Sequence, residues 1–457
     1  MIKKVISYIA LFFCLGINII IDINVKKYFE VLKECFGDRV QLTVNLYVLI
    51  CFIIALISIL IILDIYFVIK KPKDENKGIK FKEEDGTYGT SNWMNEKEMT
   101  SVLSFDKPGI ILGKYNGKLV KLPFDSYFNK NICVFGSSGS MKTIGFVLTN
   151  ILELSLHRKS IICTDPKGEI YRKTSSYFRK IGYVVKVFNL KDMRHSDRWN
   201  PLTENENITD VQTSSDVIIS NTQKHDKSGD AFWPRAEENL LRALEFYLLA
   251  NYAESNTLTN IYKKIASGDY TSLDKLFKSS FPDSPEKLSY NVFASGSDTI
   301  KASVITGLGT RLQMFQNEDL QKLTNESDID LTLPGKKPCM YYIITSDMDS
   351  AFDFLASLFY TFLFIKLNRY ADSRPDGKCE TEVFFLLDEF ANLGQIPDFN
   401  KKISTVRSRG IALVPILQNY GQIDNRFPNG QSDEVIGNCD ARLNLRSNRC
   451  KNSRIFL

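Results

Sequence analysis

The stretch NICVFGSSGSMKTIGFVLTNILEL, residues 131–154, sets the expectation for the fold. Its apolar start, 131–135, predicts a buried strand; a Gly/Ser loop follows, and helical spacing begins at Thr143. A phosphate-binding loop requires this order of strand, loop and helix, because backbone N–H groups of the loop and the helix N-terminus surround the phosphates. The usual pattern ends in Gly-Lys-Ser/Thr, and here Met141 stands in place of the second glycine.

We predict that this loop binds ATP with Mg²⁺. Lys142 would place its charge at the β and γ phosphates, and the Thr143 hydroxyl would ligate Mg²⁺. A non-glycine at Met141 costs about 1–3 kcal/mol if the position needs a positive φ, yet it keeps the N–H that binds phosphate. A Ser/Gly-rich turn without a ligand is the alternative. The predicted cofactor-binding residues are Gly136, Ser137, Ser138, Gly139, Ser140, Met141, Lys142 and Thr143.

A second apolar run, VFFLLDE at 383–389, predicts a buried strand that ends in two acids. An acid at the end of a strand beside the phosphate strand can hold Mg²⁺, and the next acid can polarise the attacking water. We therefore expect Asp388 on the metal side and Glu389 as the general base, with a solvated turn as the alternative. The run 411–417 ends in Gln418, which predicts a γ-phosphate sensor or, alternatively, a helix-capping side chain.

Short apolar runs recur after residue 130, and helical spacing separates several of them, as at 143–157. Such runs are typical of strands buried on both faces of a parallel sheet. Between 200 and 335 the runs stop, and segments such as 232–251 show helical spacing, which predicts an all-α insertion. The predicted strands are 131–135, 160–164, 183–188, 340–345, 383–388 and 411–417.

Two long apolar runs, 5–23 and 44–69, precede this body. About 20 apolar residues span a bilayer, so both runs predict transmembrane helices. Lysines flank their outer ends, which places both ends and the body that follows on the cytoplasmic side of the cell membrane. A cleaved signal peptide is the alternative for the first run, and a buried core helix for the second.

The composition of the chain limits which partners and which kinds of catalytic site we expect. The net charge of +5 is mildly basic, which permits a nucleic-acid or anionic-membrane partner without requiring one. The 9 cysteines form no C-x-x-C motif and, with only 3 histidines in the chain, show no zinc spacing. The chain therefore offers few residues for a zinc site or for histidine-based catalysis, and a nucleotide site is the stronger candidate.

The block LLDEFANLGQIPDFNKKISTVRSRGIALVPILQNYGQI, residues 386–423, resembles the second nucleotide motif and its continuation in type IV secretion coupling proteins of the TraG/TraD-like family. The pair of apolar runs before the body also resembles this family. Further matching stretches are YGTSNWMNEKEM (88–99), TDPKGEIY (164–171), WNPL (199–202), FWPRAEENLLRAL (232–244) and IGNCDARL (436–443).

This resemblance implies a membrane-anchored ATPase that forms a homo-hexameric ring at a type IV secretion channel. It implies that the ring receives a relaxase–DNA complex, the relaxosome, and couples it with single-stranded DNA to secretion-channel membrane proteins during conjugation. In such a ring an arginine of the neighbouring subunit can stabilise transition-state charge. Arg407 and Arg409 are the candidates, with ordinary surface or DNA-phosphate contact as the alternative.

The combined expectation is two N-terminal transmembrane helices followed by an α/β RecA-like P-loop NTPase domain with an inserted all-α domain. The tail RSNRCKNSRIFL, 446–457, departs from the family, which continues with further strands and helices, so we expect the RecA-like domain to be C-terminally incomplete. The expected divisions are 1–71 for the membrane anchor, 72–199 for the first RecA-like part, 200–335 for the all-α domain and 336–457 for the second RecA-like part.

Two other functions stay open. A non-catalytic docking adapter, or an inactive truncated remnant, is favoured by Met141 and by the short C-terminal end. An FtsK-like DNA translocase would share the membrane spans and the ring ATPase, but the 386–423 block favours a coupling protein. The intact Lys142, Asp388 and Glu389 favour an enzyme over an adapter.

Overall fold

A computed structural model describes residues 94–223, 232–252, 256–267, 270–346 and 351–445, and single positions at Tyr28, Val31 and Glu34. The chain divides into two compact units, Met1–Trp93 and Met94–Leu457. The predicted transmembrane runs 5–23 and 44–69, and the tail 446–457, lie outside the described residues. Within the described ranges, no helix combines the length and the apolar character needed to cross a bilayer.

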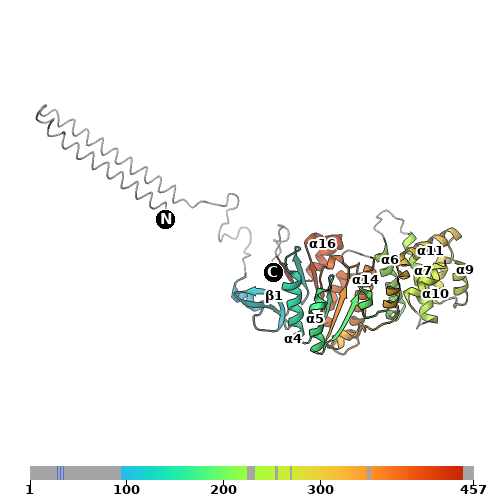
Figure 1. Cartoon of the computed structure of the whole chain (residues 1–457), viewed down its shortest axis with the longest axis horizontal. Helices are drawn as coiled ribbons and strands as arrows, with labels where there is room; N and C mark the ends of the chain where they lie inside the picture. Colours follow the sequence, from blue (N-terminus) through green and yellow to red (C-terminus); the bar gives the residue numbers. More distant parts are fainter. Residues whose placement is uncertain are drawn as a thin grey trace. The chain divides into compact units, whose positions relative to one another are not determined.

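The described part of the second unit is built on a sheet with helices packed beside it (Figure 1). The sheet has seven strands in the order β5-β6-β4-β7-β8-β3-β9. Every neighbouring pair in this sheet is parallel, as the continuous apolar runs predicted. All of the predicted strands form, and β9 is an addition at the edge. The strands are β3 (Ile132–Gly136), β4 (Ser160–Thr164), β5 (Val184–Asn189), β6 (Cys339–Ile344), β7 (Val383–Leu387), β8 (Ile411–Leu417) and β9 (Ala441–Leu445).

The central strands β3, β4, β6, β7 and β8 are buried at every position because both faces of the sheet are covered. On β3, Val134 packs into the core on one face and Phe135 into the core on the other, as the period of two in a strand requires. Helices α4 (Thr149–Leu156) and α5 (Glu169–Lys180) cover the first face, and the apolar helix α14 (Asp353–Asp372) covers the second (Figure 1).

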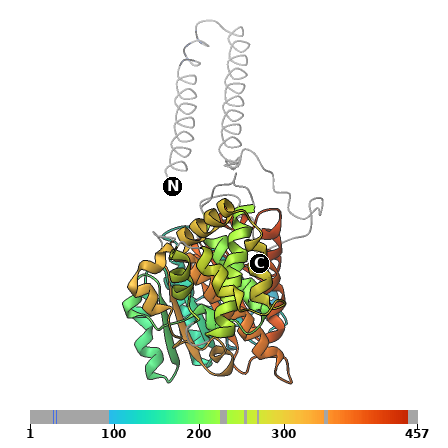
Figure 2. The same cartoon turned by 90° about the vertical axis from the view of Figure 1, so that its right-hand side faces the viewer.

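A helical layer, defined here as α6 to α12, lies between β5 and β6 in the chain and includes the helix predicted at 232–251. In Figure 2, in which the right-hand side of Figure 1 faces the viewer, the helical layer lies in front of the sheet. Helix α6 packs against both α7 and α14, so it joins the layer to the cover of the sheet. The helices are α6 (Ile208–Thr222), α7 (Phe232–Asn251), α8 (Leu258–Ala266), α9 (Tyr270–Lys278), α10 (Pro285–Ala294), α11 (Asp298–Leu312) and α12 (Glu318–Leu323).

An antiparallel hairpin, β1 (Gly109–Tyr115) with β2 (Lys118–Pro123), was not predicted. It is fastened to α4 by Asn150, whose Oδ1 accepts from the backbone N–H of Ile111 at 2.7 Å and whose Nδ2 donates to the Ile111 carbonyl at 2.9 Å. The remaining short elements are α3 (Glu96–Val102), η1 (Lys142–Leu148), η2 (Met193–His195), η3 (Pro201–Glu204), η5 (Gln313–Gln316), α13 (Leu333–Lys336), η6 (Phe390–Asn392), α15 (Phe399–Thr405), η7 (Val406–Arg409), α16 (Tyr420–Arg426) and α17 (Gln431–Gly437).

Candidate nucleotide site

The carboxyl ends of β3, β7 and β8 meet at one edge of the sheet, which is where open α/β sheets bind ligands. This edge brings together the loop after Gly136, the acids Asp388 and Glu389, and Gln418. The expectation that the acid-bearing strand lies beside the phosphate strand is wrong, because β8 runs between β3 and β7. The intervening strand places Gln418 between the loop and the acids.

The loop turns through two residues with left-handed backbone, Gly139 at φ 78° and Met141 at φ 63°. The second is the position at which the usual pattern has glycine, and the left-handed backbone explains that preference. A residue with a Cβ there costs about 1–2 kcal/mol, because Cβ crowds the following carbonyl oxygen. The Met141 side chain is 63% exposed, so little burial offsets this cost.

Gly136 is required where the strand gives way to the loop. A Cβ on this residue would lie 2.4 Å from the Ser140 hydroxyl oxygen and 2.9 Å from the Leu445 carbonyl oxygen, so only glycine fits. The Ser140 hydroxyl is buried and has no hydrogen-bond partner among the described residues. An unused buried hydroxyl inside a loop of backbone N–H groups is a donor suited to a phosphate oxygen.

Lys142 lies beneath this loop and is buried. Its ammonium donates to the carbonyl oxygens of Gly136 at 2.6 Å and Ser137 at 3.3 Å. These neutral acceptors hold the side chain in place without cancelling its charge. The positive charge therefore remains at the loop, where it can meet an anionic ligand such as a phosphate.

Thr143 joins the loop to the acid-bearing strand. Its hydroxyl donates to Oδ2 of Asp388 at 2.8 Å. Burial raises the pKa of Asp388, and the hydrogen bond from Thr143 opposes that shift by stabilising the carboxylate. A hydroxyl and a carboxylate oxygen are the ligand types that Mg²⁺ prefers, so this pair can hold the metal.

Glu389 and Gln418 form a second pair. The Gln418 side-chain amide donates to Oε2 of Glu389 at 3.0 Å, and the backbone of Glu389 is left-handed at φ 51°. The helix-capping alternative for Gln418 is wrong, because Asn419 caps α16 through a hydrogen bond from the Gln422 N–H to its side chain. Gln418 is thus available as a link between Glu389 and a bound phosphate.

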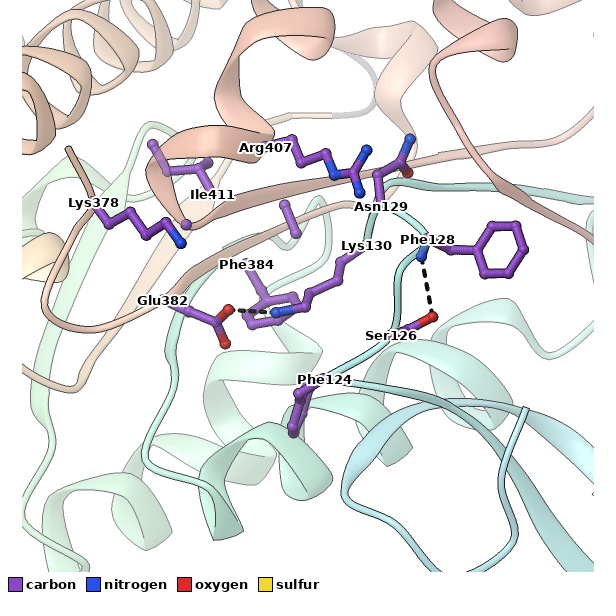
Figure 3. Close-up of a pocket in the computed structure, with 12 residues that line it drawn as sticks. Phe124, Ser126, Phe128, Asn129, Lys130, Lys378, Glu382, Phe384, Arg407 and Ile411 are labelled. Carbon is purple, nitrogen blue, oxygen red and sulfur yellow. Dashed lines mark hydrogen bonds and ion pairs between the residues drawn. The ribbon is translucent and has the colours of Figure 1, made fainter. Parts of the chain in front are cut away.

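Arg407 lies at the end of the sheet opposite to the nucleotide site, because η7 directly precedes the first residue of β8. Its guanidinium donates to the Tyr127 carbonyl and lies 5.8 Å from the centroid of the Tyr127 ring. It also lines a pocket of about 230 Å³, which the Lys130–Glu382 ion pair crosses (Figure 3). Arg407 therefore does not join the phosphate loop of its own chain, and a role in catalysis requires a neighbouring chain.

Arg409, the other candidate of the same turn, is engaged within the chain. Its guanidinium binds both carboxylate oxygens of Asp372, at 2.8 and 3.0 Å. Such a bidentate pair holds the side chain in one geometry. Of the two arginines, Arg407 is the one without a carboxylate partner among the described residues.

Asp165, which directly follows β4 at the carboxyl edge, caps a helix. Its Oδ2 accepts from the backbone N–H of Tyr171 at 2.8 Å, at the start of α5. Burial raises the pKa of Asp165, and the N–H groups of Tyr171, Glu169 and Ile170 oppose the shift. The structure thus assigns Asp165 to helix capping.

Two residues that were not predicted from the sequence form hydrogen bonds to the backbone at or next to the site residues. Gln422 accepts the backbone N–H of Gln418 on its side-chain oxygen at 2.8 Å. Arg426 donates to carbonyl oxygens of the segment that follows Glu389. The available signal was the spacing of Gln422 and Arg426, because residues four apart share one face of a helix and both lie in α16.

The chain is similar to proteins of known families. A family described as "Type IV secretory system Conjugative DNA transfer" matches residues 92–451. Conjugal transfer protein TraG of Escherichia coli is 19% identical over 409 residues, 80% of this chain and 63% of TraG. Protein VirD4 of Rhizobium radiobacter is 24% identical over 374 residues, 78% of this chain and 52% of VirD4. The chain thus spans about half to two thirds of the length of these relatives.

Solved structures of the plasmid coupling protein TrwB share the fold. Its complex with the ATP analogue ADPNP has a TM-score of 0.58 and 15% identity, covering 76% of this chain and 77% of that chain. Its complex with ADP and Mg²⁺ has a TM-score of 0.57 with the same identity of 15% and the same coverage, 76% and 77%. This likeness shows a RecA-like P-loop NTPase fold with a mostly parallel sheet. Together with the family match, it shows that the chain belongs to the type IV secretory system conjugative DNA transfer family, that of the TraG/VirD4-like coupling proteins.

Proposed function

We propose that the chain is a membrane-anchored ATPase that couples a relaxase–DNA substrate to a type IV secretion channel in conjugative DNA transfer. The observation that carries the proposal is the hydrogen bond from Thr143 to Asp388, which joins the phosphate loop to the acid strand beside the buried Lys142. A docking adapter without hydrolysis would not need this assembly. The names of the relatives, conjugal transfer protein and coupling protein, support the cellular role.

The residues at the carboxyl edge have separate roles in ATP binding and hydrolysis. The loop N–H groups and Lys142 bind the phosphates of ATP, and Thr143 and Asp388 hold Mg²⁺, as the donor set found there permits. Bound Mg²⁺ supplies neutralisation of the charge that develops on the phosphates. Glu389 orients the attacking water and accepts its proton, and Gln418 links Glu389 to the γ phosphate.

The chain works as a homo-hexamer in this proposal, as the resemblance to the coupling-protein family implies. Arg407, which precedes β8 and so lies at the end of the sheet opposite to its own phosphate loop, acts in this proposal on the nucleotide of a neighbouring subunit. The membrane anchor is 1–71, and the RecA-like parts 72–199 and 336–457 flank the all-α part 200–335. The anchor lies in the lipid bilayer of the cytoplasmic membrane beside the secretion-channel proteins. The body in the cytoplasm handles the relaxosome and single-stranded DNA.

The test is conjugative transfer from donor cells in which the chain is replaced by variants. Lys142→Ala should abolish transfer, because the phosphate loop loses its cation. Lys180→Ala, an exposed lysine at the end of α5, is the matched control and should transfer normally. If Lys142→Ala transfers like the wild type while deletion of the chain abolishes transfer, the chain is a docking adapter and the proposal fails.

A further inference from the structure

The segment Phe390–Gln395 directly follows Glu389, the proposed general base. It begins with the short turn η6 and continues without regular secondary structure. Glu389 itself has a left-handed backbone at φ 51°, which a residue with a Cβ adopts only when its surroundings impose it. The contacts that fix this segment therefore also fix where the Glu389 carboxylate lies.

Arg426 holds the segment from α16. Its guanidinium donates to the carbonyl oxygens of Ala391 at 3.4 Å, Leu393 at 2.5 Å and Gly394 at 2.6 Å. It also lies 4.5 Å from the centroid of the Phe390 ring. A guanidinium presents its donors in a rigid fork, so these bonds fix the path of the backbone.

Asn221, near the end of α6 in the helical layer, is a second residue that holds the segment. Its Oδ1 accepts from the Gln395 N–H at 2.6 Å, and its Nδ2 donates to the Gln395 carbonyl at 3.1 Å. The Ser357 hydroxyl donates to the same carbonyl. The neighbouring Gly394 lies so close to α14 that a Cβ would be 2.6 Å from the Asp353 carbonyl oxygen.

We propose that Asn221 and Arg426 are positioning residues that clamp 390–395 and so hold Glu389 in place for hydrolysis. This inference rests on the proposed ATPase function. Asn221 serves both backbone groups of Gln395, much as a strand partner would, and it comes from α6 rather than from the sheet. The helical layer is thereby connected by direct hydrogen bonds to the segment that directly follows the general base.

The first test is steady-state ATP hydrolysis by the full chain. Asn221→Ala should lower kcat about 10- to 100-fold, because a displacement of about 1 Å at a reacting group costs this order of rate. The KM for ATP should stay within about twofold, because the phosphate loop, which binds ATP, does not contact the clamp. Asn221→Asp keeps the acceptor for the Gln395 N–H and should recover part of kcat. Asn251→Ala is the control, since Asn251 donates only within α7, to Tyr247, among the described residues.

The second test is hydrogen exchange, which reports the clamp without hydrolysis. In Asn221→Ala the amides of 389–395 should exchange faster, while those of the phosphate loop and η1, 136–148, should be unchanged. Wild-type kcat in Asn221→Ala, or unchanged exchange at 389–395, overturns the clamp and leaves the ATPase proposal standing. A wild-type chain that does not hydrolyse ATP overturns the proposed function, and with it the catalytic role of the clamp.

Discussion

The hydroxyl of Thr143 lies 2.8 Å from Oδ2 of Asp388, although 245 positions separate the two residues in the chain. The strands that precede them, β3 and β7, are not neighbours, since β8 runs between them. This side-chain hydrogen bond therefore reaches past β8 and connects Thr143 of the phosphate loop with Asp388, the acid that follows β7, and these are the two residues that would hold Mg²⁺.

Replacing Thr143 with valine removes the hydroxyl and keeps the shape of the side chain. Thr143→Val should lower kcat for ATP hydrolysis about 10²- to 10³-fold, the usual loss for one group that stabilises transition-state charge. Thr143→Ser keeps the oxygen and should stay close to the wild type. Hydrolysis rates measured over a range of Mg²⁺ concentrations check this. Equal rates for the valine and serine variants would show that the hydroxyl has no part in the reaction.

Met141→Gly should raise the free energy of unfolding by about 1 kcal/mol. The gain from relieving the left-handed methionine at φ 63° exceeds the entropy that glycine adds to the unfolded chain. Ser138→Gly is the matched control, because Ser138 is in the same loop and is not among the residues with positive φ. It should be neutral or destabilising. Urea unfolding of the wild type, Met141→Gly and Ser138→Gly measures these differences in stability. A loss of stability in Met141→Gly would mean that the methionine is not strained.

Glu245 should make the chain less stable as pH rises. It is fully buried, and burial raises its pKa to about 8. Between its ordinary value of 4.5 and about 8, the folded chain keeps this proton and the unfolded chain releases it, so raising the pH favours unfolding. The expected contribution is about 1.4 kcal/mol per pH unit within this window.

Glu245→Gln should remove that slope while keeping one oxygen that can accept the hydrogen bond from Asn205, which reaches Oε2, or the one from Ser215, which reaches Oε1. Denaturant unfolding at several pH values between 5 and 8, on wild type and variant, measures the difference. Parallel stability curves for the two proteins would show that Glu245 does not keep its proton in the folded chain.

The ion pair between Arg311 and Glu237 should matter for folding. Their side chains are 13% and 8% exposed, and Nε lies 2.5 Å from Oε2. Arg311→Met leaves the Glu237 charge buried and unpaired, which costs about 3–5 kcal/mol of unfolding free energy. Lys322→Met removes the cation of an exposed pair with Glu318 and should leave the denaturation midpoint unchanged. Equal midpoints for both variants would contradict the prediction.

Much of the fold was predictable because its elements carry local signals. The strands buried on both faces are continuous apolar runs, and helix α7 coincides with the predicted range 232–251. The β1–β2 hairpin was missed because strands such as Lys118–Pro123 mix lysines with apolar residues and so lack a continuous run. β9 is only the short stretch Ala441–Leu445 and depends on pairing with β3.

The site was predictable in its residue types and less so in its arrangement. Sequence order says nothing of strand order, so the position of β8 between the two motif strands came only from the structure. The same holds for Asn221, which binds Gln395 across 174 positions. Local spacing cannot indicate contacts of that kind, because they arise only when α6 packs beside α14.

Hydrolysis of ATP by the full chain in the presence of Mg²⁺ tests the central claim most directly, with Lys142→Ala and Asp388→Asn beside the wild type. We predict that the wild type hydrolyses ATP, that Lys142→Ala fails to bind it, and that Asp388→Asn binds it without turnover. A wild type that binds ATP no better than Lys142→Ala and shows no hydrolysis would contradict the account.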